Sequence, residues 1–295
     1  MTLEQLRIFL AVADGQHMSR AASKVGLTQS AVSAAIAALE KRHDVRLFDR
    51  IGRHIALTEA GRTFVREARS VLDRAETAEL VLDDLSHQPR GRIRLYASQT
   101  VASYWLPTRL LALHHTYPNI RVELTVGNTS QVAISVEEGR ADIGLVEGSV
   151  SQLDLHRQVI ARDRLVLVMA ADHPEQDIDE LTTPIWVLRE EGSGTRSEFE
   201  SYLQSKGKRI ADLIVALELP SNEAVLAAVR NSKCLSVLSE QTVEAAQAAG
   251  WVRTKPLPGA ERSFSILTHP ERHRTRAVSL MLDTLTCRSS HSGPA

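Results

Sequence analysis

The stretch from residue 59 to residue 88 most constrains how this chain of 295 residues can fold. It contains no proline and only one glycine, and its apolar residues recur at alternating steps of four and three. These positions are Phe64, Ala68, Val71, Ala75, Ala78, Leu82 and Leu85. A heptad repeat forms a narrow apolar stripe on a helix, and such a stripe needs a partner. We expect a linker helix over residues 59–89 that pairs with a second copy of the chain; the alternative is a helix that lies on its own domain.

Residues 1–58 show three short helical patterns separated by tight turns. Apolar residues at helical spacing predict a first helix that ends at Gly15. A second helix is predicted to begin with Ser19 as its cap. After a turn at Gly26, a third helix is predicted over residues 29–43. Two helices joined by a short turn that contains glycine form the helix-turn-helix arrangement.

The start of the third helix carries side chains that suit base recognition in DNA. Gln29, Ser30 and Ser33 are polar, and Ala34 is small enough for the helix to enter a major groove. Glutamine can bond adenine with two hydrogen bonds, and serine can bond either kind of base edge. We therefore predict that these four residues contact DNA. The alternative is that the three helices form only a packing unit.

The next segment, VRLFDRIGRHIALT, predicts a two-stranded hairpin whose tip carries Arg50, Arg53 and His54. A basic tip beside a recognition helix can reach a phosphate or the minor groove, so we predict that these residues also contact DNA. The local charge agrees. Residues 1–70 hold eleven Lys and Arg against seven Asp and Glu, a balance of +4, whereas the whole chain has a net charge of -1.

Composition excludes several classes of protein. Hydrophobic residues make up 43% of the chain and charged residues 24%, which is typical of a globular protein. The sequence has no apolar run of about 18 residues, as a membrane span requires, and no secretory signal at its start. Two cysteines, Cys234 and Cys287, are too few for a disulfide framework or a zinc site. We expect a cytoplasmic protein without membrane contact, metal or other cofactor.

From Arg90 onward, strand-like apolar runs alternate with helical patterns. This alternation predicts βαβ units on a largely parallel sheet. The predicted strands cover residues 93–96, 120–126, 142–146, 165–169, 185–188, 214–219 and 235–238. Two such lobes would bind a ligand in the cleft at the carboxyl ends of their strands.

Four polar segments lie where predicted strands end and helices begin. They are Ser98-Gln99-Thr100, Asn128-Thr129, Ser193-Gly194-Thr195-Arg196 and Ser221-Asn222. The N–H groups at a helix N-terminus attract anions, a glycine permits close approach of the backbone, and Arg196 adds positive charge. Each segment alone is more simply a helix cap. Together they predict a pocket for a small anionic metabolite or an inorganic anion.

The sequence offers only weak candidates for a catalytic site. The segment GSGT is too short for a nucleotide-binding loop and lacks its lysine. The adjacent pairs Glu137-Glu138 and Glu190-Glu191 point apart on a helix or strand, so they are poor acid–base pairs. We therefore expect no enzymatic activity.

The residues from Leu3 to Gly61 resemble the LysR-type transcriptional regulators. The most specific parts of the match are Leu27-Thr28-Gln29-Ser30-Ala31-Val32-Ser33, Leu47-Phe48-Asp49-Arg50 and Leu57-Thr58-Glu59-Ala60-Gly61. The remainder resembles the effector domain of that family more loosely. The segments WVLREEGSGTR, GNT and GLVEG are similar to regulators of sulfur, nitrogen and carbon assimilation, and the last adds Glu147 to the candidate effector contacts.

Two positions depart from the pattern of the family. His43-Asp44 stands where relatives usually have Leu-Gly, and aspartate tolerates the left-handed turn better than most residues do. Ala34 stands where relatives often carry a basic residue. These departures affect individual contacts with bases and phosphates rather than the placement of the helix.

The resemblance implies a multidomain α+β protein. It consists of a winged helix-turn-helix over residues 1–58, a linker helix over 59–89 and an effector-binding domain over 90–295. That domain has two α/β lobes like those of periplasmic binding proteins, with lobe I at about 90–161 and 267–295 and lobe II at about 162–266.

The family also implies specific partners. We expect double-stranded DNA with a pseudopalindromic operator, a small anionic effector, and self-association through the linker helix into a homodimer and then a homotetramer. Two half-sites separated by helical turns of about 10 base pairs would match the two-fold symmetry of such an assembly. The alternative is a cytoplasmic small-molecule receptor, or an α/β enzyme, that carries an accessory amino-terminal domain.

Overall fold

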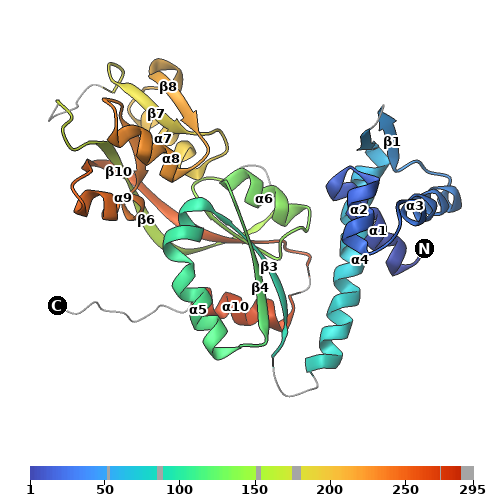
Figure 1. Cartoon of the computed structure of the whole chain (residues 1–295). Coiled ribbons are helices and arrows are strands. Elements are labelled where there is room, and N and C mark those ends of the chain that lie inside the picture. The colour runs from blue at the N-terminus through green and yellow to red at the C-terminus, as the bar shows by residue number, and fades with distance from the viewer. Residues whose placement is uncertain (52–53, 85–88, 151–153, 175–180, 273, 287–295) are drawn as a thin grey trace. The chain divides into compact units, whose positions relative to one another are not determined.

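The computed structural model describes residues 1–51, 54–84, 89–150, 154–174, 181–272 and 274–286 (Figure 1). The chain forms two compact units. The amino-terminal unit is built mainly from Met1–Gln88, and the carboxy-terminal unit is built mainly from the residues that follow. Among the described residues, no helix is both long enough and apolar enough to cross a membrane.

The amino-terminal unit begins with three short helices, α1 (Leu3–Gly15), α2 (Met18–Val25) and α3 (Gln29–His43). The predicted third helix over residues 29–43 is thus confirmed. Thr28 explains where α3 begins, because its side chain accepts a hydrogen bond from the Ala31 N–H group at 3.2 Å.

α1 ends at Gly15, as predicted, and its C-cap Gln16 adopts a left-handed φ of 45°. The predicted start of α2 is wrong. His17, not Ser19, is the N-cap of α2, and Ser19 lies inside the helix. The turn after α3 forms as expected, because Asp44 adopts a left-handed φ of 50°.

An antiparallel hairpin and a long helix complete the amino-terminal unit. They are β1 (Phe48–Ile51), β2 (His54–Leu57) and α4 (Glu59–Asp84). The ring of Phe9, which is fully buried, lies 5.4 Å from that of Phe48 and 4.9 Å from that of Phe64, measured between centroids. The hairpin and the first turns of α4 therefore share one core with the three short helices.

The first part of the heptad repeat is used inside this unit. Phe64 and Ala68 pack in the core, so the alternative interpretation, a helix that lies on its own domain, holds for these turns. Val71 is 40% exposed, and Ala78 is also exposed. The side chains of the last two predicted positions, Leu82 and Leu85, lie outside the described part of the chain. The apolar surface that α4 leaves open thus begins at Val71.

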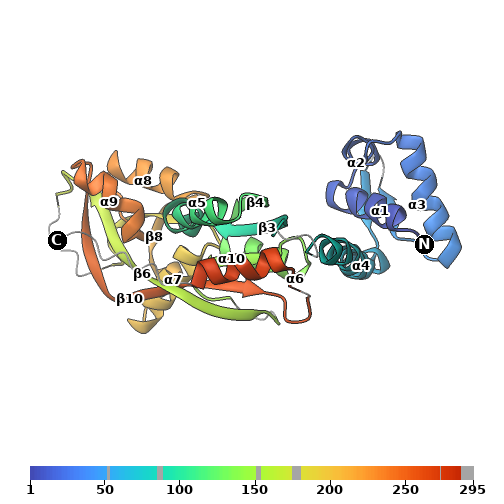
Figure 2. The ribbon, with the colours of Figure 1, turned by 90° about the horizontal axis from the view of Figure 1, so that it is seen from below.

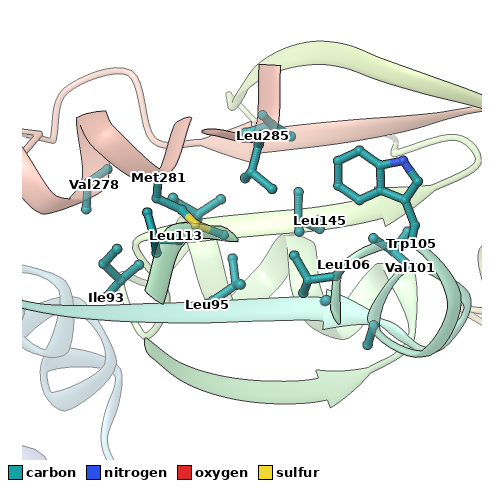
Figure 3. Packing of buried hydrophobic residues seen from close by; sticks show 14 of the residues in the cluster. Ile93, Leu95, Val101, Trp105, Leu106, Leu113, Leu145, Val278, Met281 and Leu285 are labelled. Atoms are coloured by element: carbon teal, nitrogen blue, oxygen red, sulfur yellow. The ribbon is translucent and has the colours of Figure 1, made fainter. Parts of the chain in front are cut away.

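Lobe I of the carboxy-terminal unit is built on parallel strands. β3 (Gly91–Ser98) pairs with β4 (Ile120–Gly127) on one side and with β5 (Ile143–Glu147) on the other. Its helices are η1 (Val101–Trp105), α5 (Pro107–Thr116), α6 (Thr129–Glu137) and α10 (Arg276–Thr286). Figure 3 shows Met281 and Leu285 of α10 facing the apolar side chains of β3, including Ile93 and Leu95.

Lobe II repeats the parallel arrangement on a smaller scale. β7 (Ile185–Arg189) pairs in parallel with β8 (Ile214–Leu219), and β9 (Ser236–Ser239) belongs to the larger sheet. The helices are α7 (Gly194–Ser205), η2 (Ile210–Asp212), α8 (Asn222–Arg230) and α9 (Glu240–Ala248). Trp186 and Phe199 lie in the core with their ring centroids 5.1 Å apart.

Two long antiparallel strands, β6 (His156–Ala170) and β10 (Val252–Thr268), run side by side through both lobes (Figure 2). One end of β10 pairs with β5 of lobe I, and one end of β6 pairs with β9 of lobe II. The predicted lobe boundaries fall on these strands. The prediction of a largely parallel sheet is wrong here, because β10 and the first half of β6 were not expected and both strands pair antiparallel to their neighbours.

Candidate functional site

The start of α3 presents the predicted base-reading side chains. Gln29, Ser30 and Ala34 are exposed and Ser33 is half-buried, whereas the opposite face of the helix packs in the core. The Ser19 hydroxyl donates to Gln29 Oε1 at 3.1 Å, and the Ser30 hydroxyl lies 3.0 Å from that of Thr28. These contacts hold the polar side chains in place without covering them, so the helix start is free to meet a duplex.

The side chain of Glu40, near the end of α3, holds the backbone where the hairpin begins. Glu40 Oε1 accepts hydrogen bonds from the backbone N–H groups of Leu47 and Phe48 at 2.7 and 3.1 Å. Gly61 at the start of α4 lies so close to this segment that an added Cβ would be 2.2 Å from the Leu47 carbonyl oxygen. The glycine is therefore required for α4 to pack against the chain between α3 and β1.

The predicted basic tip is only partly described. Arg50 belongs to β1 and His54 begins β2, but the side chains of both lie outside the described part of the chain, and so does Arg53 as a whole. Their contacts with DNA stay predictions.

In the carboxy-terminal unit, the predicted effector residues come together where lobes I and II meet. Ser98 ends β3, Thr129 begins α6 and Glu147 ends β5, all in lobe I. Gly194 begins α7 in lobe II, and an added Cβ on it would lie 2.1 Å from the Glu147 carbonyl oxygen. Only glycine allows this close approach, which brings the first turn of α7 against lobe I.

Glu147 lies at the centre of this junction. It is 1% exposed, and its carboxylate accepts a hydrogen bond from the Ser98 hydroxyl. The Thr129 hydroxyl donates to the Glu147 backbone carbonyl at 2.8 Å. Two of the predicted hydroxyl groups therefore donate their protons to protein atoms rather than to an open space.

A second set of contacts joins the lobes through α8. The Asn222 N–H group donates to Gln99 Oε1 at 2.7 Å, and the Gln99 amide donates to Glu223 Oε2 at 2.6 Å. The Asn222 side chain donates to Thr100 Oγ1 at 3.1 Å. Ser221 acts as a plain N-cap, accepting from the Ala224 N–H group at 3.0 Å. The polar groups at the start of α8 thus already have hydrogen-bond partners within the protein.

The remaining predicted polar start, at α6, also has protein partners. The backbone N–H group of Asn128 donates to Gln131 Oε1 at 3.0 Å, and its side-chain oxygen accepts from the Gln131 N–H group at 3.0 Å. The Asn128 amide reaches across to Glu190 Oε1 at 3.3 Å, and Glu190 is in turn held by the buried Arg189. This segment therefore links the lobes as well.

Arg196, predicted to supply positive charge, is neutralised by neighbouring carboxylates. Its Nε donates to Glu200 Oε1 at 3.0 Å, and its Nη1 forms an ion pair with Glu218. Burial lowers the pKa of Arg196, but its hydrogen bonds to Glu218 and Glu200, together with the charges of these carboxylates, outweigh burial and raise its pKa overall. Its charge is thus already balanced within lobe II.

At the junction of the lobes, three buried hydroxyl groups have a proton that no described residue accepts in a hydrogen bond. Thr195 Oγ1 accepts from Arg262 at 3.0 Å, and Thr100 Oγ1 accepts from Asn222, so neither bond uses the hydroxyl proton. The hydroxyl of Ser193, the N-cap of α7, has no hydrogen-bond partner among the described residues. These groups come from both lobes, and two of them lie at the N-terminus of α7.

Sequence reasoning missed Asp163 and Arg262, which lie opposite each other on β6 and β10. A signal for them was present. Along β10, Ala260, Arg262 and Phe264 are buried at every second position, so a charged residue stands where the alternation requires an apolar one. Asp163 breaks the buried alternation of β6 in the same way. A charge at an inward position of a strand needs a buried partner.

Comparison with known proteins places these sites in context. The model of the bacterial regulatory helix-turn-helix protein, lysR family, matches residues 3–62, and that of the LysR substrate binding domain matches residues 86–289. The uncharacterized HTH-type transcriptional regulator YeiE of Escherichia coli strain K12 is 33% identical over 289 residues, which cover 96% of each chain.

Two solved structures are similar as well. A full-length OxyR variant from Pseudomonas aeruginosa has a TM-score of 0.74 at 21% identity and covers 100% of this chain and 99% of its own, which shows a shared fold. The regulatory domain of CcmR from Synechocystis PCC6803, solved in complex with 2-PG, has a TM-score of 0.62 at 26% identity and covers 69% of this chain and 99% of its own.

Replacement of Gly61 by alanine tests how tightly α4 is packed against the hairpin. A Cβ at this position meets a backbone oxygen, which cannot move aside cheaply. We expect Gly61→Ala to lower the free energy of unfolding by about 1–3 kcal/mol, the usual cost of overpacking. Chemical denaturation of the full chain, followed by circular dichroism, measures the change.

Gly15→Ala is the matched control. Nothing lies within 4 Å of a Cβ at Gly15, and this glycine is the last residue of a helix in the same unit. Its replacement should leave the free energy of unfolding unchanged or raise it slightly. Equal effects of the two substitutions would contradict the close approach at Gly61.

Proposed function

This chain belongs to the LysR family of DNA-binding transcriptional regulators, and we propose that a small anion bound between lobes I and II is the effector that controls its DNA binding. The carboxy-terminal unit is the effector-binding domain of the family. What is proposed here is the chemical class of the effector and the residues that bind it.

For DNA, we propose that α3 reads bases through Gln29, Ser30, Ser33 and Ala34. The exposure of the first turns of α3 supports this assignment, because the same helix is anchored on its other face by Val32, Ile36 and Leu39. The hairpin held by Glu40 would bring Arg50, Arg53 and His54 to the DNA backbone or the minor groove.

Self-association through α4 completes the DNA-binding assembly. Val71 and Ala78 of the apolar stripe are exposed on this helix, and an apolar stripe on a long polar helix is stabilised by a partner helix. We propose a homodimer that pairs the α4 helices and associates further into a tetramer, with a pseudopalindromic operator as its DNA partner.

The observation that carries the anion proposal is the set of three buried hydroxyl groups without an acceptor for their protons. Ser193 and Thr195 stand at the start of α7, whose first-turn N–H groups have no partner within the helix and favour negative charge. The third, Thr100, is the N-cap of η1 in lobe I. Hydroxyl and N–H donors that lack a protein acceptor can bind the oxygen atoms of an oxyanion. They do not suit a cation or a neutral apolar ligand.

Glu147 opposes this attraction and therefore limits where the anion can sit. Its carboxylate is buried, and Arg262 Nη1 lies 4.0 Å from it but is already paired with Asp163. The favourable position for an anion is thus on the side of α7, away from the carboxylate. A small oxyanion fits this restriction better than an extended ligand does. The relative solved with 2-PG supports the same chemical class.

Replacing Gln29 tests the assignment of the recognition helix. We expect Gln29→Ala to weaken binding to a duplex selected by the native chain from random sequences by about tenfold, because one base contact is worth about 1–3 kcal/mol. The slope of log affinity against log salt should not change, since glutamine neutralises no phosphate. Fluorescence anisotropy measures both quantities.

Gln204→Ala, at an exposed position on α7, is the control and should bind the duplex as the native chain does. Native affinity in Gln29→Ala would show that the base-reading surface lies elsewhere. A reduced salt slope in that variant would place Gln29 near the phosphates instead.

Replacing Thr195 tests the anion site. In the full native chain, at least one of inorganic sulfate, inorganic phosphate and 2-PG should bind by calorimetry and raise the melting temperature, as any ligand specific for the folded state does. Thr195→Val should weaken that binding by about 10- to 100-fold, since hydrogen bonds to charged groups contribute about 1.5–3 kcal/mol.

Thr284→Val is the matched control, because the Thr284 hydroxyl on α10 donates to the Leu280 carbonyl and faces no site. It should bind the anion with native affinity. If only neutral or cationic compounds stabilise the native chain, the proposal of an anionic effector is wrong.

Neutralising Glu147 should have the opposite effect. Two unit charges about 7 Å apart interact by about 2 kcal/mol at an effective dielectric constant of 20. Glu147→Gln removes this repulsion and keeps an oxygen that accepts from Ser98, so the affinity for the anion should rise about tenfold or more. Glu244→Gln, on the exposed side of α9, should leave it unchanged. Weaker anion binding in Glu147→Gln would mean that the carboxylate contributes to the binding site.

A further inference from the structure

We propose that Arg262 is a positioning residue for the effector: it occupies the oxygen of Thr195 and thereby leaves the Thr195 hydroxyl proton for the bound anion. This inference rests on the proposed anion site and adds the residue that prepares it.

The contacts of Arg262 define a direction for each of its donors. Its side chain is fully buried, its Nε donates to Asp163 Oδ2 at 2.8 Å, and its Nη2 lies 2.7 Å from the same oxygen. A guanidinium group is planar, so these two contacts orient the third nitrogen as well. That nitrogen, Nη1, donates to Thr195 Oγ1 at 3.0 Å.

The hydroxyl of Thr195 has only one proton, and arginine cannot accept it. A guanidinium group carries donors and no acceptor, so in this bond the threonine oxygen must be the acceptor. The Thr195 proton then has to point away from Arg262. Since the described residues offer it no acceptor, the bond is completed only when a ligand oxygen enters.

Neighbouring hydroxyl groups show the contrast. Ser98 and Thr129 both donate to Glu147, through its carboxylate and its backbone carbonyl, so their protons are already used. Glu147 Oε1 lies 4.0 Å from Arg262 Nη1. Without the guanidinium group, nothing among the described residues would fix the orientation of the Thr195 hydroxyl, and its proton would no longer be directed at an anion.

Asp163 and the strand pairing hold the arginine in place. Asp163 and Arg262 are direct partners in the register between β6 and β10. The other oxygen of Asp163, Oδ1, accepts from the Ser239 hydroxyl at 2.9 Å. The carboxylate is therefore fixed from two sides, and the side chain of Arg262 is fixed by the carboxylate.

Direct attraction between Arg262 and the anion is a weaker explanation. The guanidinium charge faces two buried carboxylates, those of Asp163 and Glu147, so this cluster carries no excess positive charge. The two carboxylates therefore cancel the attraction of the guanidinium charge for a distant anion. The hydrogen bond to Thr195 is the contact through which Arg262 can favour the ligand.

A double-mutant cycle tests this route. The joint replacement Asp163→Asn with Arg262→Gln removes the guanidinium group without leaving the Asp163 carboxylate as an unpaired buried charge. We measure, by calorimetry with the full chain, the affinity for whichever of inorganic sulfate, inorganic phosphate and 2-PG binds the native protein. The joint replacement should weaken binding at least fivefold. When Thr195→Val is added, the further loss should stay within about twofold, because both changes remove the same donor.

The positioning role is wrong if the losses of anion affinity multiply in the variant that carries all three replacements. It is also wrong if the joint replacement binds the anion with native affinity. Arg164→Gln is the matched control, since it removes a guanidinium group at the neighbouring position, where Arg164 pairs with Glu240 at the surface. It should bind with native affinity. If no anion binds the native chain, the proposed effector class fails; if the native chain binds and only the cycle disagrees, this inference alone fails.

If the joint replacement does not fold, a less disruptive variant tests the same role of Arg262. Ser239→Ala removes one of the two contacts of the Asp163 carboxylate and leaves all charges in place. We expect it to weaken anion binding two- to fivefold in the native background and not at all in the Thr195→Val background. An equal effect in both backgrounds would show that the network is only structural.

Discussion

The antiparallel pairing of β6 with β10 is the constraint on which the carboxy-terminal unit depends. Both strands belong to both lobes, since β10 continues into the pairing with β5 and β6 into the pairing with β9. The register shifts between Pro256 and Glu261, and pairing resumes so that Arg262 faces Asp163. Because of this register, a buried ion pair stands beside the first turn of α7. Any change in the angle between the lobes must bend these two strands, and so it must disturb the contacts of Arg262.

How far the sequence predicts the fold depends on how local the determining interactions are. The bounds of α3 follow from Thr28, Gly26 and a regular apolar face, all within a few residues of the helix, and they were predicted correctly. The start of α2 was not, because His17 occupies the cap without a side-chain hydrogen bond and leaves no signature in the sequence. The heptad repeat of α4 predicted one partner surface, whereas Phe64 and Ala68 pack against the unit's own core. Periodicity shows that a face is apolar, not what covers it.

β10 is an element that the local sequence does not predict. It contains Pro256, Pro258 and Gly259, residues that are depleted in strand interiors, and its partners lie far away in the sequence. Nothing local favours a strand of this length. The pairing with β6 overrides the weak propensity, and the irregularity between Pro256 and Glu261 accommodates the prolines. Arg262 was missed for the same reason, since a charge at an inward position is recognisable only after the strand itself has been recognised.

The candidate effector site shows why residue type alone does not define a binding site. The sequence placed four polar helix starts at one cleft, and the structure does bring them to the junction of the lobes. Two of those starts, at α6 and α8, already bond to protein partners, and Arg196 is neutralised by Glu200 and Glu218. What distinguishes the start of α7 is that the Thr195 oxygen accepts from Arg262 on a distant strand, whereas the Ser193 hydroxyl has no hydrogen-bond partner among the described residues. The binding capacity of the junction therefore depends on which donors remain unused once every internal hydrogen bond has been formed, a property that only the assembled lobes possess.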